Sequence, residues 1–257
     1  MSPHARDKRR DEKRQTALAQ HKTDSRRNKQ VLVISLILVL VVGGFVGLSY
    51  ALKKDSTTPV TALGAGCGSQ PGVPTGKRSG TLPDKKTAAG KTFIARVATN
   101  CGVITIELDG TKAPQAVASF LGLAKSGYWA DSPCHRLTTG DPLFVLQCGD
   151  PTGTGNGTPG YGFGVENAPP NFIYPAGTLA MARTQDPNSN GGQFFIVYKQ
   201  STISDPTGYS IFGKITSGLD IVNKIAAAGA TQPDVNQNTA PLQPISILAV
   251  NVTQKKA

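Results

Sequence analysis

The chain opens with a polar stretch and then changes abruptly to an uninterrupted apolar run. Residues 31–52 contain no charged side chain, and as a helix they would be about 33 Å long at about 1.5 Å per residue. A bilayer's hydrocarbon core is about 30 Å thick, so the run predicts a transmembrane helix. A cleaved signal peptide would have an apolar core of only about 7–15 residues. A buried core helix fits poorly because the run is apolar on all faces.

The hydrophobic pattern divides the remainder of the chain into a linker and a folded domain. Residues 53–92 are rich in Gly, Pro, Ser, Thr and Lys and show no sustained hydrophobic period, which is typical of a flexible tether. Short apolar segments begin at Phe93. The predicted organisation is therefore a basic tail over 1–30, a transmembrane helix over 31–52, a linker over 53–92 and a domain over 93–257.

Within the domain, alternating and helical periods predict many short strands and two helices. Residues 93–99 and 103–108 form a predicted hairpin, and residues 113–127 and 218–229 have the apolar spacing of amphipathic helices. Further strands are predicted at 135–139, 143–148, 178–182, 193–198, 210–215 and 245–252. This pattern favours a mainly β fold, namely a closed antiparallel barrel with two helices.

The net charge of +11 belongs to the N-terminal part of the chain. Residues 1–54 hold twelve basic and four acidic residues, whereas residues 93–257 hold ten of each. Basic residues before a membrane span favour a cytoplasmic N-terminus, which places everything after residue 52 outside the cytoplasm. The balanced domain gives no reason to expect nucleic-acid binding. Binding of the tail to anionic lipid or RNA is an alternative to a plain retention signal.

The four cysteines are candidates for two disulfides in an oxidising compartment. Cys134 and Cys148 flank a predicted strand–turn–strand, so they are expected to face each other, which leaves Cys67 and Cys101 as the second pair. Four buried free thiols are the alternative. No C-x-x-C spacing is present, and we expect no metal site.

Hydrolytic and cofactor chemistry find little support in the sequence. His135 is the only histidine after the apolar run, and no G-x-S-x-G motif accompanies it. Residues 155–160 match G-x-G-x-x-G, but Pro159 interrupts them and no helix follows, so they are interpreted as a loop. A different set stands out: one arginine, two glutamines and aromatic residues on neighbouring strands. These can hold an apolar ring and place a hydrogen-bond donor beside an amide.

Four ordered motifs carry a resemblance to the cyclophilins, the cyclophilin-type peptidyl-prolyl cis-trans isomerases, over residues 93–252. They are His135–Asp150, Gly177–Arg183, Asn188–Ile196 and Ile211–Lys214. The resemblance implies a closed eight-stranded antiparallel barrel with two helices and an isomerase that needs no cofactor. With the predicted anchor, the chain resembles a membrane-anchored, bacterial-type member whose globular domain is expected to be monomeric.

The resemblance also implies roles for individual residues. Arg136 matches the catalytic arginine. Substrate contacts are implied for the following residues: Phe144, Val145, Gln147, Ala182, Arg183, Gln193, Phe195, Ile203 and Tyr209. Arg183 replaces the usual asparagine, so its backbone is the expected contact.

Two further departures from the family pattern concern segments. Residues 141–143 are an insertion, and residues 202–209 replace a run that normally holds a tryptophan. Ile203 and Tyr209 are expected to take the places of Leu and His in that run.

Two functions are therefore carried forward. The first is a prolyl isomerase that assists the folding of exported or membrane proteins, with proline-containing polypeptides as partners and the membrane bound through residues 31–52. The alternative is a catalytically weak module of the same fold that binds proline-containing segments of a partner protein.

Overall fold

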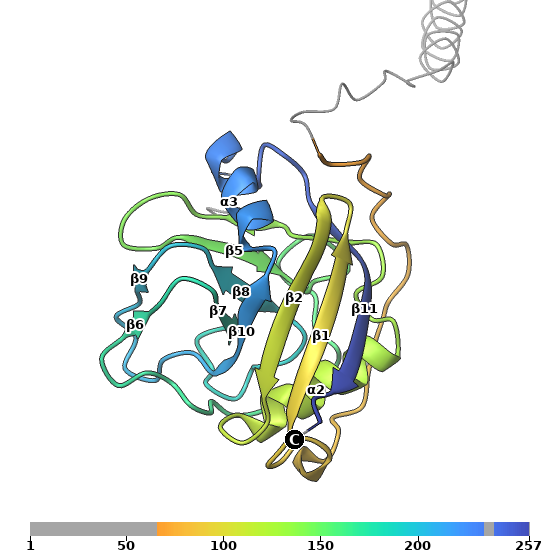
Figure 1. Ribbon diagram of the computed structural model, residues 1–257, viewed down its shortest axis with the longest axis vertical. Helices are drawn as coiled ribbons and strands as arrows, with labels where there is room; N and C mark the ends of the chain where they lie inside the picture. Colours follow the sequence, from red (N-terminus) through yellow and green to blue (C-terminus); the bar gives the residue numbers. More distant parts are fainter. Residues whose placement is uncertain (1–65, 234–238, 257) are drawn as a thin grey trace, which may run out of the picture. The chain divides into compact units, whose positions relative to one another are not determined.

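The computed structural model describes residues 66–233 and 239–256 (Figure 1). These residues form a nine-stranded sheet, a two-stranded sheet, two α-helices and one 3-10 helix. The elements in chain order are η1 (Lys85–Thr87), β1 (Thr92–Thr99), β2 (Gly102–Asp109), α2 (Pro114–Lys125), β3 (Ser132–Pro133), β4 (Arg136–Leu137), β5 (Val145–Cys148), β6 (Ile173–Tyr174), β7 (Thr178–Met181), β8 (Phe194–Val197), β9 (Ser201–Thr202), β10 (Ile211–Ser217), α3 (Leu219–Ala228) and β11 (Ser246–Gln254).

The large sheet is antiparallel and curves around the core as a half-barrel. Its strand order is β3-β11-β1-β2-β10-β7-β8-β5-β4, and the small sheet pairs β6 with β9. The prediction of a mainly β fold with two helices is confirmed for this part of the chain. The predicted closed, eight-stranded barrel is wrong, because the ladder has nine strands and remains open between β3 and β4.

The two end strands of the sheet, β3 and β4, follow each other in one short segment of the chain. They do not pair with each other, so the ladder does not close. Pro133 in β3 has no N–H to donate to a neighbouring strand. Two backbone N–H groups after Pro133 donate to the segment before β11. The N–H of Cys134 donates to Ile245 O at 2.9 Å, and that of Leu137 donates to Thr239 O at 2.7 Å. The short segment thus pairs with β11 at β3 and with β5 at β4.

Strands β1 and β2 form the expected hairpin because every second residue of each is apolar and faces the core. Every second residue of β1 from Phe93 to Val97, and of β2 from Ile104 to Leu108, is buried in the core. The turn needs a left-handed residue, and Gly102 supplies it with a φ of 127°. Figure 1 shows these two long strands beside β11.

The helices lie at opposite ends of this group of long strands in the view of Figure 1. Helix α2 begins at Pro114, where a missing N–H costs nothing, and it buries Val117, Phe120 and Leu123. The Phe120 ring packs against Trp129, with 4.6 Å between ring centroids. Helix α3 is shorter and buries only Val222 and Ile225.

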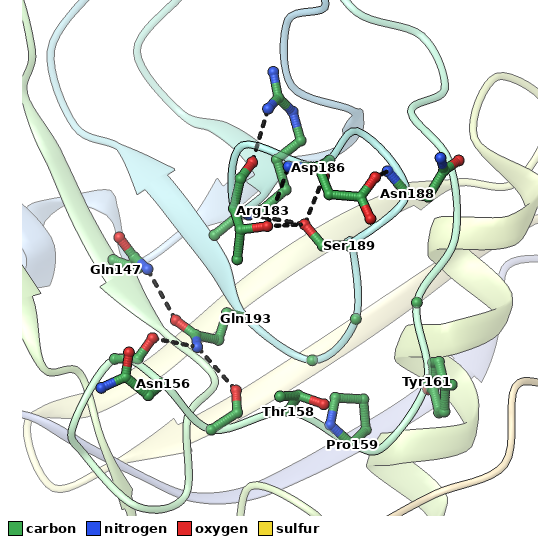
Figure 2. A pocket seen from close by; sticks show the side chains of 17 residues that line it. Gln147, Asn156, Thr158, Pro159, Tyr161, Arg183, Asp186, Asn188, Ser189 and Gln193 are labelled. Atoms are coloured by element: carbon green, nitrogen blue, oxygen red, sulfur yellow. Dashed lines mark hydrogen bonds between the residues drawn. The ribbon is translucent and has the colours of Figure 1, made fainter.

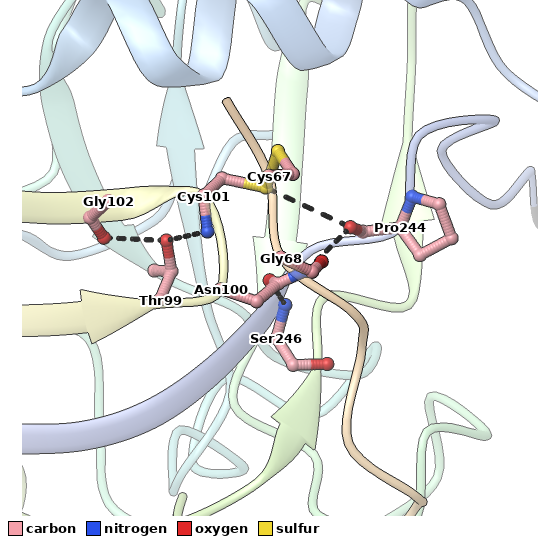
Figure 3. Close-up of a disulfide and its surroundings, with 8 residues drawn as sticks. All are labelled: Cys67, Gly68, Thr99, Asn100, Cys101, Gly102, Pro244 and Ser246. Atoms are coloured by element: carbon pink, nitrogen blue, oxygen red, sulfur yellow. Dashed lines mark hydrogen bonds between the residues drawn. A yellow bond between two sulfur atoms is a disulfide. The ribbon is translucent and has the colours of Figure 1, made fainter. Parts of the chain in front are cut away.

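The chain from residue 66 to residue 92, which its composition assigns to the linker, is in contact with the domain. A disulfide joins Cys67 to Cys101, and the N–H of Gly68 donates to Asn100 O at 2.7 Å (Figure 3). The Arg78 guanidinium donates to the carbonyls of Tyr128 and Ala130 at 2.9 and 2.6 Å. These long-range contacts have no signature in local composition.

The predicted basic tail and transmembrane helix, residues 1–30 and 31–52, lie outside the described residues. Among the residues that the structure does describe, none of the helices combines the length and the hydropathy needed to cross a bilayer.

Candidate active site

The candidate site lies on the outer face of strands β5, β7 and β8, on the opposite side of the sheet from the main core. Side chains alternate along a strand, so Phe194 enters the core while Phe195 points outward, and Leu146 and Gln147 divide in the same way. The outward residues form a second, smaller apolar cluster. Its buried members are Val145, Tyr174, Ala180, Phe195 and Val197.

A cavity of about 170 Å³ opens over this cluster. It is lined by Arg136, Leu143, Val145, Gln147, Ala182, Arg183, Phe195, Ile203 and Tyr209. Eight of these nine residues are ones that we expected at the site from the sequence. The cavity brings together residues from β4, β5, β8 and the segment after β9, which are far apart in the chain.

Phe144 does not line this cavity. Its ring packs edge-on to Tyr198 at 6.0 Å between centroids, and the ammonium of Lys199 lies 4.3 Å from its centroid. Phe144 directly precedes Val145, so strand alternation turns the two side chains to opposite faces. Leu143, the last residue of the insertion, lines the cavity instead. The structure thus does not place Phe144 among the residues that line this cavity, and its predicted substrate contact stays a prediction.

Arg136 is held at the cavity by a chain of amide hydrogen bonds. Arg136 on β4 lies opposite Gln147 on β5, and its Nη1 donates to Gln147 Oε1 at 3.3 Å. Gln147 Nε2 in turn donates to Gln193 Oε1 at 2.9 Å, as Figure 2 shows. Burial lowers the pKa of the Arg136 guanidinium, which nevertheless remains charged at any physiological pH.

The chain of hydrogen bonds ends on a loop organised by one buried carboxylate. Gln193 Nε2 donates to the carbonyls of Gly155 and Gly157, each at 2.9 Å. The Asp150 carboxylate accepts the N–H groups of Thr152, Gly155 and Gly157 at 2.7–3.0 Å. Burial alone would raise the pKa of Asp150, but hydrogen bonds from the Thr152 hydroxyl and from these N–H groups outweigh it and hold the pKa below its usual value.

Gln193 lines a second, more polar cavity of about 420 Å³ next to the first (Figure 2). The two cavities share Gln147, Ala182 and Arg183. Thr184, Asp186, Asn188 and Ser189 contribute polar groups to the second one, and these groups bond mainly to one another. A chain running past Arg136 can therefore place neighbouring residues in both cavities.

The segment that replaces the tryptophan run forms the outer wall of the first cavity. The Tyr209 ring meets Phe195 edge-on, with 5.6 Å between centroids. The N–H of Ile203 donates to Phe172 O at 3.0 Å, and that of Tyr209 donates to the Tyr174 hydroxyl at 2.8 Å. The single tryptophan of the chain, Trp129, lies in the core instead.

His135 is next to Arg136 but takes no part in the cavity. Both of its ring nitrogens are buried without a hydrogen-bond partner, and burial lowers its pKa. It is thus a neutral side chain packed beneath the loop at Gly155. Across the described residues, no group of three or more His, Cys, Asp or Glu side chains is arranged to hold a metal ion.

Sequence reasoning missed three contributors to the site: Leu143, Asp150 and Asp205. Leu143 could have been found from strand alternation counted back from Gln147. Asp150 stands in the matched motif, but its role depends on a loop whose path the sequence does not show. Asp205 contacts Arg183 at 2.7 Å, and nothing in the local pattern indicates that pair.

The arrangement can bind and polarise an amide, and it offers no nucleophile with a base beside it. A charged, fork-shaped donor stands beside an apolar slot, and two amides hold it in orientation. Such a site suits a reaction in which no covalent bond is broken, because the only change is rotation about a partial double bond.

Comparisons with known proteins agree with this geometry. The model of the family "Cyclophilin type peptidyl-prolyl cis-trans isomerase/CLD" matches residues 94–252. Probable peptidyl-prolyl cis-trans isomerase B of Mycobacterium leprae is 41% identical over 192 residues, covering 68% of this chain and 63% of the relative. Its counterpart in Mycobacterium tuberculosis is 41% identical over 187 residues, covering 66% and 59%. The chain thus spans about three fifths of the length of these relatives.

Among solved structures, a Cryptosporidium parvum cyclophilin type peptidyl-prolyl cis-trans isomerase, crystallised in the presence of the dipeptide Ala-Pro, is similar. It has a TM-score of 0.52 and 32% identity, and the match covers 63% of this chain and 99% of that one. The family model, the relatives and the solved structure agree on one family and fold. The chain belongs to the cyclophilin-type peptidyl-prolyl cis-trans isomerase family.

Proposed function

We propose that this protein is an active peptidyl-prolyl cis-trans isomerase that binds the proline ring of its substrate in the 170 Å³ cavity. The observation that carries the proposal is the position of Arg136, at the wall of an apolar slot and hydrogen-bonded to Gln147. The similar structure crystallised with Ala-Pro supports a proline-containing ligand.

The chemistry follows from the electronic structure of the amide. Rotation about X–Pro breaks amide resonance across a barrier of about 18–20 kcal/mol. In the twisted state the proline nitrogen regains a lone pair, which the Arg136 guanidinium stabilises by donating to it. Since that lone pair is absent from the planar ground state, the interaction is selective for the transition state. A selective stabilisation of about 4 kcal/mol corresponds to roughly a thousandfold in rate.

The decisive experiment is a protease-coupled isomerisation assay with the full chain in detergent and a peptide that contains Ala-Pro. Arg136→Ala should lower kcat/KM roughly a hundredfold or more, because it removes the donor to the twisted amide. Arg136→Lys keeps the charge but loses the planar fork, so it should remain well below wild type. Arg96→Ala, an exposed arginine on β1, is the matched control and should match wild type.

The same assay separates the proposal from the binding-module alternative. A wild-type chain that binds the peptide but produces no rate above the uncatalysed reaction would establish the alternative. An Arg136→Ala variant that folds and catalyses as fast as wild type would show that the site is wrongly assigned.

We further propose that the domain lies outside the cytoplasm and acts on exported or membrane proteins. The ten basic residues before the apolar run support this orientation, and so do the two cysteine pairs, which suit an oxidising compartment. A reporter that is active only in the cytoplasm, fused after Ala257, should be silent. Activity of that fusion would overturn the orientation.

A further inference from the structure

A second arginine, Arg183, stands between the two cavities, and its guanidinium is committed to protein contacts. Its side chain is only 2% exposed, and Nη2 lies 2.7 Å from Asp205 Oδ1. Nε donates to Gly208 O at 3.1 Å. Nη1 donates to Thr184 O at 2.9 Å (Figure 2). Because its charge is paired with Asp205 and two of its N–H groups donate to backbone carbonyls, the guanidinium is poorly placed to bind an anionic substrate.

The contacts of Arg183 converge on the wall that faces Phe195. Its guanidinium carbon lies 4.6 Å from the centroid of the Tyr209 ring, which is within the range of a cation–π interaction. The same ring meets Phe195 edge-on at 5.6 Å. Arg183, which follows directly after β7 and Ala182, therefore spans from the floor of the cavity to its outer wall.

The Arg183 side chain makes the polar contacts that join the middle of the wall segment to the domain. The segment is held at its ends by the N–H of Ile203, which donates to Phe172 O, and by the N–H of Tyr209, which donates to the Tyr174 hydroxyl. Between them, the Asp205 carboxylate accepts the N–H groups of Thr207 and Gly208 at 2.9 and 3.2 Å, and so organises a turn. That turn is joined to the domain through the Asp205–Arg183 ion pair.

We propose that Arg183 is a positioning residue that locks residues 203–209 and thereby sets the Tyr209 ring as the outer wall of the proline cavity. This inference rests on the proposed function, since it assigns the site's specificity for proline to that wall. The wall contacts the ring in the planar and twisted states alike, so its loss should raise KM and leave kcat nearly unchanged.

The test is a double-mutant cycle on the full chain in detergent, with Arg183→Lys and Tyr209→Ala. The dissociation constant of an Ala-Pro tetrapeptide is measured by NMR titration, and KM and kcat are measured in the coupled assay. Arg183→Lys keeps a charge for Asp205 but loses the fork. We expect it to weaken binding about tenfold, with kcat changed less than about threefold. In the Tyr209→Ala background the same substitution should change the dissociation constant less than about twofold.

Two further variants complete the design. Asp205→Asn leaves the residues that line the cavity unchanged but weakens the ion pair with Arg183. It should therefore weaken peptide binding in the same way as Arg183→Lys. Asp220→Asn removes a carboxylate from an exposed ion pair on α3 and serves as the control, with binding like that of wild type. Thermal unfolding of each variant separates a loosened wall from a lost fold.

The outcomes distinguish this inference from the proposed function. Additive effects of Arg183→Lys and Tyr209→Ala, or an Arg183→Lys variant that binds like wild type, would overturn the positioning role. If the wild-type chain binds the peptide and the double-mutant cycle shows the expected coupling, but no catalysis is measured, the isomerase activity is refuted. The positioning role of Arg183 is then still supported. A wild-type chain that binds no proline peptide would overturn both.

Discussion

At the scale of single residues, the alternation of side chains along β5 and β8 separates stability from function. Gln147 lies between Leu146 and Cys148, which are both buried in the core. In the same way, Phe194 is buried in the core, whereas Phe195 faces the cavity. Substitution of the half-buried Gln147 should therefore change activity with little cost to the core, whereas truncation of Leu146 or Phe194 should destabilise the domain.

Gly157→Ala tests the loop that ends the hydrogen-bond chain. A Cβ at this position would overlap the Asp150 carboxylate, so the loop must shift and withdraw the carbonyl that orients Gln193. We expect kcat/KM to fall roughly tenfold, which is about 1.4 kcal/mol of transition-state stabilisation. Gly72→Ala, whose added Cβ would meet no atom within 4 Å, should be silent. Equal activity of both variants would show that the loop does not position Gln193.

His135 predicts a loss of stability in mild acid. Burial lowers its folded pKa below 6.5, so the unfolded chain binds a proton that the folded chain does not. The contribution of neutral His135 to the free energy of unfolding is therefore fully present above pH 6.5. It falls as the pH drops through 6.5 toward the folded pKa. Nearby Asp150 titrates lower, because its pKa is held below 3.8.

The measurement is the melting temperature between pH 7.5 and pH 5.0. It should decrease with falling pH in wild type and much less in His135→Gln, which has no proton to gain. Parallel curves for the two proteins would assign the acid sensitivity to another group.

At the scale of elements, the first turn of α2 depends on a residue far away in the sequence. Ala113 at the N-cap provides no side-chain acceptor. The Glu166 carboxylate instead accepts the N–H groups of Gln115 and Ala116 at 2.9–3.1 Å. This contact ties the long loop after β5 to a helix of the core.

Glu166→Gln should destabilise the domain by about 1 kcal/mol, because it replaces a charged acceptor at a helix N-terminus by an amide. Urea unfolding followed by circular dichroism measures the change. Asp220→Asn, in the exposed first turn of α3, removes a comparable charge without such hydrogen bonds and should cost much less. An equal effect of the two substitutions would mean that the Glu166 contact contributes only its charge.

At the scale of the whole domain, two disulfides join segments that the sheet alone would leave loose. Cys134–Cys148 links the segment between β3 and β4 to β5, across 14 residues of sequence. Cys67–Cys101 links the start of the described chain to the β1–β2 turn, across 34 residues. The second bridge holds residues 66–92 against the domain together with Arg78.

Replacing Cys67 and Cys101 by serine should lower the free energy of unfolding by up to about 4 kcal/mol by loop-closure entropy. The variant should also lose protection against proteolysis in one segment: limited proteolysis should cut between residues 66 and 83 in this variant and not in wild type. The matched variant, with Cys134 and Cys148 replaced by serine, should lose about 3 kcal/mol without exposing that segment. Unchanged protease resistance of the first variant would show that the other contacts suffice.

Local periodicity in the sequence was sufficient for the hairpin, both helices and the mainly β class, because each depends on neighbours two to four residues apart. The ordered motifs were sufficient for the family. The predicted roles of Arg136, Gln147 and Gln193 stay predictions, although the structure brings all three into one hydrogen-bonded chain.

Tertiary structure alone decided the features that depend on long-range partners. It put Leu143 in the cavity in place of Phe144, left the sheet open where Pro133 interrupts pairing, and gave Arg183 its partner Asp205. The physical reason is common to all of them. A side chain's spacing along the chain indicates which face it shares with its neighbours, but its contacts depend on which distant segment the fold brings opposite that face.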